Sequence, residues 1–144
     1  MVRVLSGRLL AILLVIGMAG LAAGCDDESP TTPTTPVVPV TETFTGQVTQ
    51  SGSATHNFST STSGAVSATL KAIGTDNTLV VSFSLGTWTG TACSVVLAND
   101  AATGGAVLTG TMTGAGTLCA RVGDVGNIAA GQAVAYTIEV THPS

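Results

Sequence analysis

The chain has 144 residues, of which 44% are hydrophobic and 8% are charged, and its formal net charge is −4. Its four basic residues cannot form the cationic surface that holds a nucleic-acid backbone or an anionic lipid headgroup. Nucleic-acid binding therefore has no electrostatic footprint, adhesion to anionic lipid headgroups is disfavoured, and no nucleic-acid partner is expected.

The chain opens with a short apolar segment that follows two basic residues. Arg3 and Arg8 precede an uncharged, mostly apolar run at residues 9–21, whose length is typical of secretory signals and short for a membrane-spanning helix. Leu-Ala-Ala-Gly then leads to Cys25, and this ending resembles the lipobox of bacterial lipoprotein signal peptides. We expect residues 1–24 to be removed and acyl chains such as palmitate to be attached to Cys25. An uncleaved anchor and a secretory signal cut elsewhere are the alternatives.

Lipidation at Cys25 would place the protein in the cell envelope. Each buried CH₂ contributes about 0.8 kcal/mol to membrane binding, so two or three acyl chains hold a protein firmly. We therefore expect the membrane to be a partner through the N-terminal lipid, on the periplasmic or extracellular side. The inner and the outer membrane are both open as the site of anchoring.

Residues 25–40 are expected to comprise the lipidated cysteine and a linker rich in proline and threonine. Pro30, Pro33, Pro36 and Pro39 recur at every third position, which matches the three residues per turn of polyproline II. Such a segment is a semi-rigid spacer. A PxxP ligand for an aromatic groove is the alternative interpretation.

Residues 41–144 are expected to form one all-β domain. Apolar and polar residues alternate with a period of two, which turns one set of side chains to the core and the other to water. Turn-forming residues separate the runs. The predicted strands cover residues 42–49, 54–59, 66–71, 79–85, 92–98, 106–113, 117–122 and 136–141. About eight short strands predict a single antiparallel β-sandwich with jelly-roll-like connections, and the strongly apolar run 79–85 is expected in the interior of a sheet.

Cys93 and Cys119 are expected to form a disulfide. A protein outside the cytoplasm meets oxidising conditions, and this bridge would close a loop of about 26 residues and stabilise the fold by roughly 3–4 kcal/mol. Two buried free thiols are the alternative. Alternation puts Cys119 on the outer face but Cys93 on the inner face with Leu97, so the bridge requires Cys93 at the start of a strand, where alternation need not hold.

Three segments occur in a recognisable order. His-Asn-Phe at 56–58 precedes a glycine-led strand at 63–70, Gly-Thr-Leu-Cys-Ala-Arg-Val lies at 116–122, and Tyr-Thr-Ile-Glu-Val lies at 136–140. This set resembles the bacterial pre-peptidase C-terminal (PPC) domain, a β-sandwich usually found beside secreted proteases. The resemblance implies a PPC-like sandwich at residues 41–144 and a role as a substrate-targeting or maturation domain. It also implies calcium or collagen binding in some relatives.

The residues after Cys25 show no catalytic constellation. They contain two histidines, of which His56 is expected to be a half-exposed strand residue and His142 to lie in an exposed tail. No serine lies in a Gly-x-Ser-x-Gly elbow, and no close carboxylate pair or phosphate-binding loop occurs. We therefore predict a protein that is not an enzyme and has no catalytic residues and no cofactor.

The oxygen-rich turns contain Asp100, Asp124 and Asn127. Ca²⁺ takes six to eight oxygen ligands, several of them from carboxylates, and two acids far apart in the sequence do not supply them. We expect these three residues to serve turns and no metal site to form, with calcium binding as the weaker alternative.

Trp88 is the residue that most invites a role in recognition. It lies in the segment 86–90, which is expected to be a turn. It either contacts a ligand, as aromatic residues at interfaces do, or caps one open end of the core, which is the favoured interpretation. The whole pattern predicts a lipid-anchored interaction, structural or ligand-display module with an unidentified protein or glycan partner. The alternative is an accessory domain of a secreted hydrolase system encoded elsewhere.

Overall fold

The computed structural model describes residues 36–144. The predicted signal peptide, Cys25 and most of the linker lie outside the described residues. The described part is all-β, and none of it forms a helix that could cross a membrane. Its eight strands are β1 (Pro39–Thr49), β2 (Ser53–Thr60), β3 (Gly64–Ile73), β4 (Val81–Trp88), β5 (Cys93–Ala102), β6 (Val107–Met112), β7 (Gly116–Gly123) and β8 (Ala133–Pro143).

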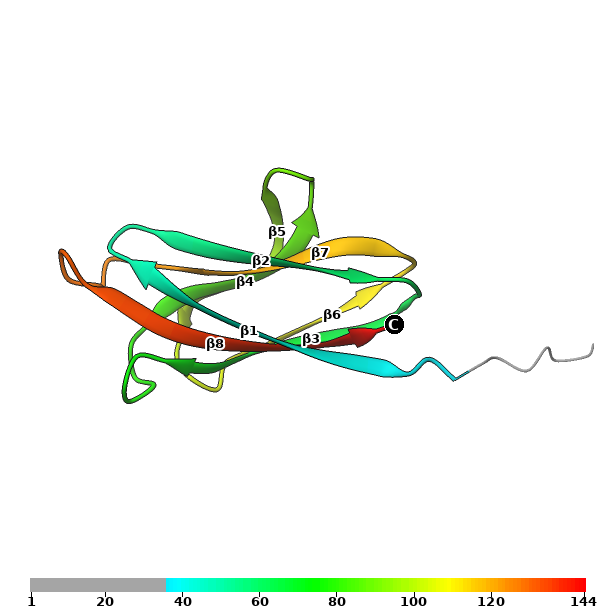
Figure 1. The fold of residues 1–144 in the computed structure, drawn as a ribbon, viewed down its shortest axis with the longest axis horizontal. Helices are drawn as coiled ribbons and strands as arrows, with labels where there is room; N and C mark the ends of the chain where they lie inside the picture. The colour runs from blue at the N-terminus through cyan, green and yellow to red at the C-terminus, as the bar shows by residue number, and fades with distance from the viewer. Residues whose placement is uncertain (1–35) are drawn as a thin grey trace, which may run out of the picture. The chain divides into compact units, whose positions relative to one another are not determined.

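The strands form two antiparallel sheets that lie one over the other (Figure 1). One sheet has the order β1-β8-β3-β6 and the other the order β2-β7-β4-β5. Each of the first four strands pairs with one of the last four: β1 with β8, β2 with β7, β3 with β6, and β4 with β5. The chain is thus one long hairpin rolled into two layers, which is a jelly roll. The predicted β-sandwich is confirmed.

Each predicted run coincides with or overlaps one strand. The run 79–85 corresponds to β4, which lies between β7 and β5, so its interior place in a sheet is as expected. β4 begins and ends later than predicted, and Trp88 is its last residue rather than part of a turn. The longest pairing joins β1 to β8 and runs without a break from Pro39 opposite Pro143 to Thr49 opposite Ala133.

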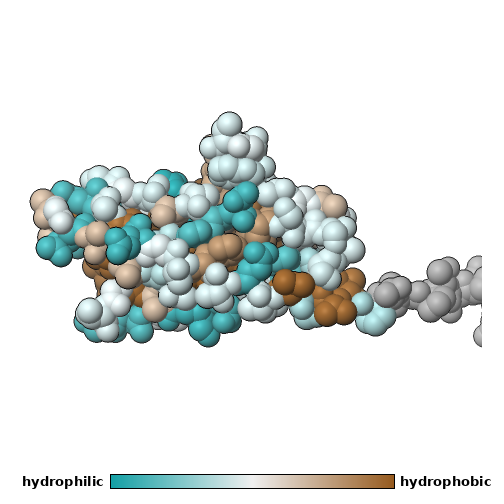
Figure 2. Space-filling model, viewed as in Figure 1, coloured by the Kyte–Doolittle hydropathy of each residue, from teal (hydrophilic) through white to brown (hydrophobic). Residues whose placement is uncertain are grey.

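The hydrophobic core fills the space between the sheets. In β8 the buried residues Tyr136, Ile138 and Val140 alternate with the partly exposed residues Thr137 and Glu139, as the period of two predicts. The largest fully buried side chains are those of Phe83, Leu70, Ile73, Ile138, Val48, Val66, Val81, Val122 and Val140. The face of the molecule shown in Figure 2 is mostly neutral or hydrophilic, and a hydrophobic patch lies where the described chain begins.

His142 does not lie in an exposed tail, and that prediction was wrong. β8 runs on to Pro143, and His142 is only 3% exposed. Its Nε2 lies 2.8 Å from Oε1 of Glu42 on β1, and its ring packs on Phe58 of β2 with centroids 5.2 Å apart. Pairing with β1, about a hundred residues earlier in the chain, orders this end. A local pattern cannot reveal so distant a partner.

His56 is half-buried, as expected for a strand residue, but it faces the interior between β1 and β2. Its ring stacks on Phe44 with centroids 5.0 Å apart, and its Nε2 lies 2.8 Å from the hydroxyl of Tyr136. Burial lowers the pKa of His56 below its ordinary value of 6.5, because a charged imidazole is poorly solvated there. Burial also raises the pKa of Tyr136. Both groups therefore favour their neutral forms.

We expect the domain to lose stability as the pH falls from about 7.5 to about 5.5. In this window the unfolded chain protonates His56 near its ordinary pKa, whereas the folded chain keeps it neutral. The unfolded state then binds more protons than the folded state. The free energy of unfolding therefore decreases as the pH decreases. Urea denaturation at a series of pH values measures this slope. His56→Gln should flatten it, and a variant that retains the full slope would refute the assignment to His56.

Candidate functional site

The β4–β5 hairpin bends away from its sheet and stands out from the molecule (Figure 1). Leu85 pairs with Leu97, but the next residue, Gly86, pairs with Val95. Val96 is therefore an extra residue on β5, which makes a β-bulge, and bulges bend the strand that carries them. The side chain of Val96 is 68% exposed at this bend. The bulge thus explains why the tip of the hairpin leaves the plane of the sheet.

Gly86 permits the backbone of β5 to pass close to β4. A Cβ atom at this position would lie 2.1 Å from the carbonyl oxygen of Ser94 and 2.9 Å from the Cα of Val95. Backbone atoms cannot yield as the tip of a side chain can, so a larger residue here would push the hairpin away. The glycine therefore sets the position of the hairpin over the outer face of the sheet.

The predicted disulfide between Cys93 and Cys119 is present and ties the hairpin to the sheet. The two Cα atoms lie 5.7 Å apart. Cys119 on β7 is opposite Gly86 on β4, and Cys93 is opposite Trp88. Cys93 is the first residue of β5, as the prediction required. The bulge at Val96 adds the physical reason, because one extra residue reverses the alternation and turns Cys93 to the outer face.

A hollow of about 370 Å³ opens on the outer face beside this disulfide. We call it the hairpin hollow. Residues of the hairpin, of β2 and of β7 line it, namely Trp88, Thr91, Ala92, Cys93, Thr55 and Arg121. Trp88 is half-buried and is not part of the hydrophobic core. It lies on the outer face of the sheet, so the expectation that it caps an open end of the core was wrong.

Arg121 brings an uncompensated positive charge to the hairpin hollow. Its side chain is exposed, and its Nη2 donates a hydrogen bond to Oγ of Ser53 at 3.0 Å. Within residues 36–144 no carboxylate lies in ion-pair distance of Arg121, whereas Lys71 pairs with Glu139 at 3.8 Å. Nothing in the sequence pattern singles out Arg121 as a site residue, because its place in the same hollow as Trp88 depends on which strands are neighbours.

Asp100, Asp124 and Asn127 lie apart from the hairpin hollow, and each has structural partners. The Asp124 carboxylate accepts the backbone N–H groups of Ser51, Gly126, Asn127 and Ile128. The bond from Ser51, with the others, holds the pKa of Asp124 below its usual value. The Asn127 amide donates to the carbonyl oxygen of Val80, and Asp100 accepts from Ser82. Across residues 36–144 no three His, Cys, Asp or Glu side chains are grouped as metal ligands.

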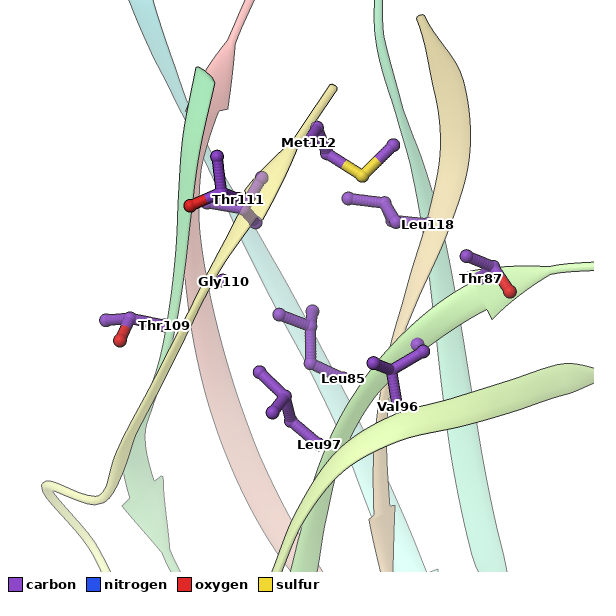
Figure 3. A pocket seen from close by; sticks show the side chains of 11 residues that line it. Leu85, Thr87, Val96, Leu97, Thr109, Gly110, Thr111, Met112 and Leu118 are labelled. Carbon is purple, nitrogen blue, oxygen red and sulfur yellow. The ribbon is translucent and has the colours of Figure 1, made fainter. Parts of the chain in front are cut away.

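A groove of about 390 Å³ opens between the edges of the two sheets. The side chains of Leu85, Leu97, Met112 and Leu118 lie around it (Figure 3). β5 and β6 are both edge strands there, and no charged residue lines the groove. It is an open margin of the hydrophobic core, whereas the hairpin hollow combines an aromatic ring, hydroxyl groups and a positive charge.

A scan against protein-family models found no match, and a search of curated proteins found no similar chain. The hairpin hollow has a lining of mixed aromatic and polar character. Its lining contains neither a histidine nor a carboxylate, which are the usual partners of a nucleophile or a general acid. An aromatic face, a guanidinium and two threonine hydroxyls can bind a ligand, and the disulfide holds the hairpin that carries some of them.

Proposed function

We propose that this protein is a lipid-anchored binding module of the bacterial cell envelope and not an enzyme. In this proposal Cys25 carries the lipid, residues 26–38 are the spacer that ends where β1 begins, and a PPC-like sandwich displays the hairpin hollow to a partner. The observation that carries the proposal is that Trp88 and Arg121, which has no carboxylate partner within residues 36–144, line one hollow beside a disulfide-tied hairpin. Tryptophan, tyrosine and arginine are the residue types most enriched at binding hot spots.

The positions of the two described histidines support a role without catalysis. His56 contacts Phe44 and Tyr136 between the sheets, and His142 is buried against Glu42. Both face the inside of the sandwich, and neither lines the hairpin hollow. A general base must reach the reacting atom within hydrogen-bond distance, and these side chains are already engaged elsewhere.

The arrangement of the tether and the hollow also supports display. The described chain enters the domain through β1, which belongs to one sheet, while the hairpin hollow belongs to the outer face of the other sheet. About thirteen linker residues in polyproline II conformation would span roughly 40 Å at about 3.1 Å per residue. Such a spacer would hold the hollow clear of the membrane surface.

The test of the anchor is the intact mass of the protein purified from bacterial membranes, before and after reduction. We expect a chain that begins at Cys25, carries the added mass of its acyl chains and gains two hydrogens when the disulfide is reduced. Cys25→Ala is the matched control and should yield a chain without acyl mass that leaves the membrane fraction. Recovery of the wild-type chain from the cytosol, uncut and without acyl groups, would refute the proposal.

A further inference from the structure

The guanidinium of Arg121 is the feature of the hairpin hollow that selects the ligand. A guanidinium has five N–H donors, and within residues 36–144 the side chain makes a single hydrogen bond, to Ser53. No acidic residue lines the hollow, so a bound anion would meet no local repulsion. The remaining donors form a planar fork that matches a carboxylate with two parallel hydrogen bonds. The hollow is therefore suited to a ligand that carries a carboxylate.

The other lining residues indicate what carries that carboxylate. Trp88 offers a flat, electron-rich ring, and Thr55 and Thr91 offer hydroxyl groups that both donate and accept hydrogen bonds. A sugar ring presents C–H groups on one face and hydroxyl groups around its edge, so it can meet both kinds of group together. A volume of about 370 Å³ lies near the small end of ligand sites, which span roughly 300–1,000 Å³. A short saccharide fits such a site better than an extended peptide does.

We propose that the hairpin hollow binds an acidic sugar residue of a glycan, with its carboxylate on Arg121 and its ring against Trp88. This inference deepens the proposed function and rests on it for the place where binding occurs. The disulfide between Cys93 and Cys119 holds the hairpin against the sheet before the ligand arrives. Binding then needs little reorganisation, which favours affinity for a small ligand.

The chain supplies its own reporter for this binding. Trp88 is the only tryptophan in the sequence, so a change in tryptophan emission reports on the hairpin hollow alone. The probe is a short galacturonic acid oligosaccharide, titrated into the detergent-solubilised full chain and followed by fluorescence and calorimetry. Three comparison ligands are the methyl-esterified oligosaccharide, the neutral galactose oligosaccharide of equal length, and a short peptide with a free C-terminal carboxylate.

We expect the galacturonic acid oligosaccharide to bind and the esterified and neutral ones to bind at least about tenfold more weakly, since a hydrogen bond to a charged group is worth more than a factor of ten. Arg121→Gln should weaken binding by a similar factor, and Trp88→Ala should weaken it when followed by calorimetry. Lys71→Gln is the matched control because it removes the other described cation, which is paired with Glu139 on the other sheet. This variant should bind as the wild type does.

Three outcomes would overturn the inference. The first is equal binding of the neutral sugar, which would remove the role of the carboxylate. The second is tighter binding of the peptide, which would make the partner a protein. The third is no binding of the acidic sugar by a chain whose circular dichroism shows it is folded. If the chain is lipidated but does not bind the acidic sugar, the anchor proposal stands and the sugar proposal fails. If the chain binds the sugar but is not lipidated, the sugar proposal stands and the anchor proposal fails. Thr55→Val offers a second, milder lining variant if Arg121→Gln does not fold.

Discussion

Replacing Phe83 with alanine is expected to lower the free energy of unfolding by about 3–5 kcal/mol, the usual cost of truncating a buried phenylalanine. Phe83 is the largest fully buried side chain and is 0% exposed. It lies on β4, which has a neighbouring strand on each side, so the surrounding backbone cannot collapse into the cavity. A domain of ordinary stability has only about 5–15 kcal/mol in total. Urea denaturation followed by circular dichroism measures the loss.

Val96→Ala is the control for Phe83→Ala, because it also removes apolar side-chain atoms but from an exposed position. Val96 is 68% exposed at the bulge of β5, and surface substitutions usually change stability by less than about 0.5 kcal/mol. The two variants should therefore differ by several kcal/mol. A Phe83→Ala protein that unfolds at the same urea concentration as the control would contradict the packing of this core.

Replacing both Cys93 and Cys119 with alanine is expected to cost about 3–4 kcal/mol of stability. The disulfide closes a loop with a sequence separation of 26 residues, and the entropy that it removes from the unfolded chain accounts for a loss of this size. Alanine is preferred to serine because Cys119 is fully buried, and a serine at this site would bury an unpaired hydroxyl. Denaturation of the variant beside the oxidised wild type measures the difference.

The same variant should show a local effect at the hairpin. Without the bridge, the bulged segment of β5 keeps only its strand pairing with β4, so its amide hydrogens should exchange faster than those of β8. Chemical reduction of the wild type should reproduce both changes and serves as the control for the substitutions. Unchanged stability together with unchanged exchange in β5 would show that the bridge does not hold the hairpin.

The strands could be predicted from the sequence because their signal is local. In β8 and β4, alternating apolar side chains mark the inner face within a few residues of one another, and glycine or asparagine marks the turns between strands. The jelly-roll-like connections were predicted, but the order of the strands in each sheet was not and comes from the structure. The Cys93–Cys119 bridge was predicted from compartment and number alone.

The parts that could not be predicted depend on pairing between distant segments. One additional residue at Val96 reverses a period of two, and no local pattern marks such a bulge. The bulge places Cys93 on the outer face, where it lies opposite Trp88. Arg121 joins them because β7 lies beside β4, although the two strands are far apart in the sequence. His142 is buried for the same kind of reason, since β1 pairs with its strand and Phe58 of β2 packs on its ring.

The long β1–β8 pairing would have a mechanical consequence if the domain is held through Cys25, as we propose. Strand hydrogen bonds in an antiparallel pair run across the strands, so tension that enters at Pro39 along β1 loads the ladder in shear. Every rung from Pro39 to Thr49 shares this load, and Ser144 adds two bonds to the carbonyl oxygen of Val38 at the point of entry. Rungs loaded in shear share the tension instead of opening one after another, so β1 would resist a pull from a tether on its N-terminal side.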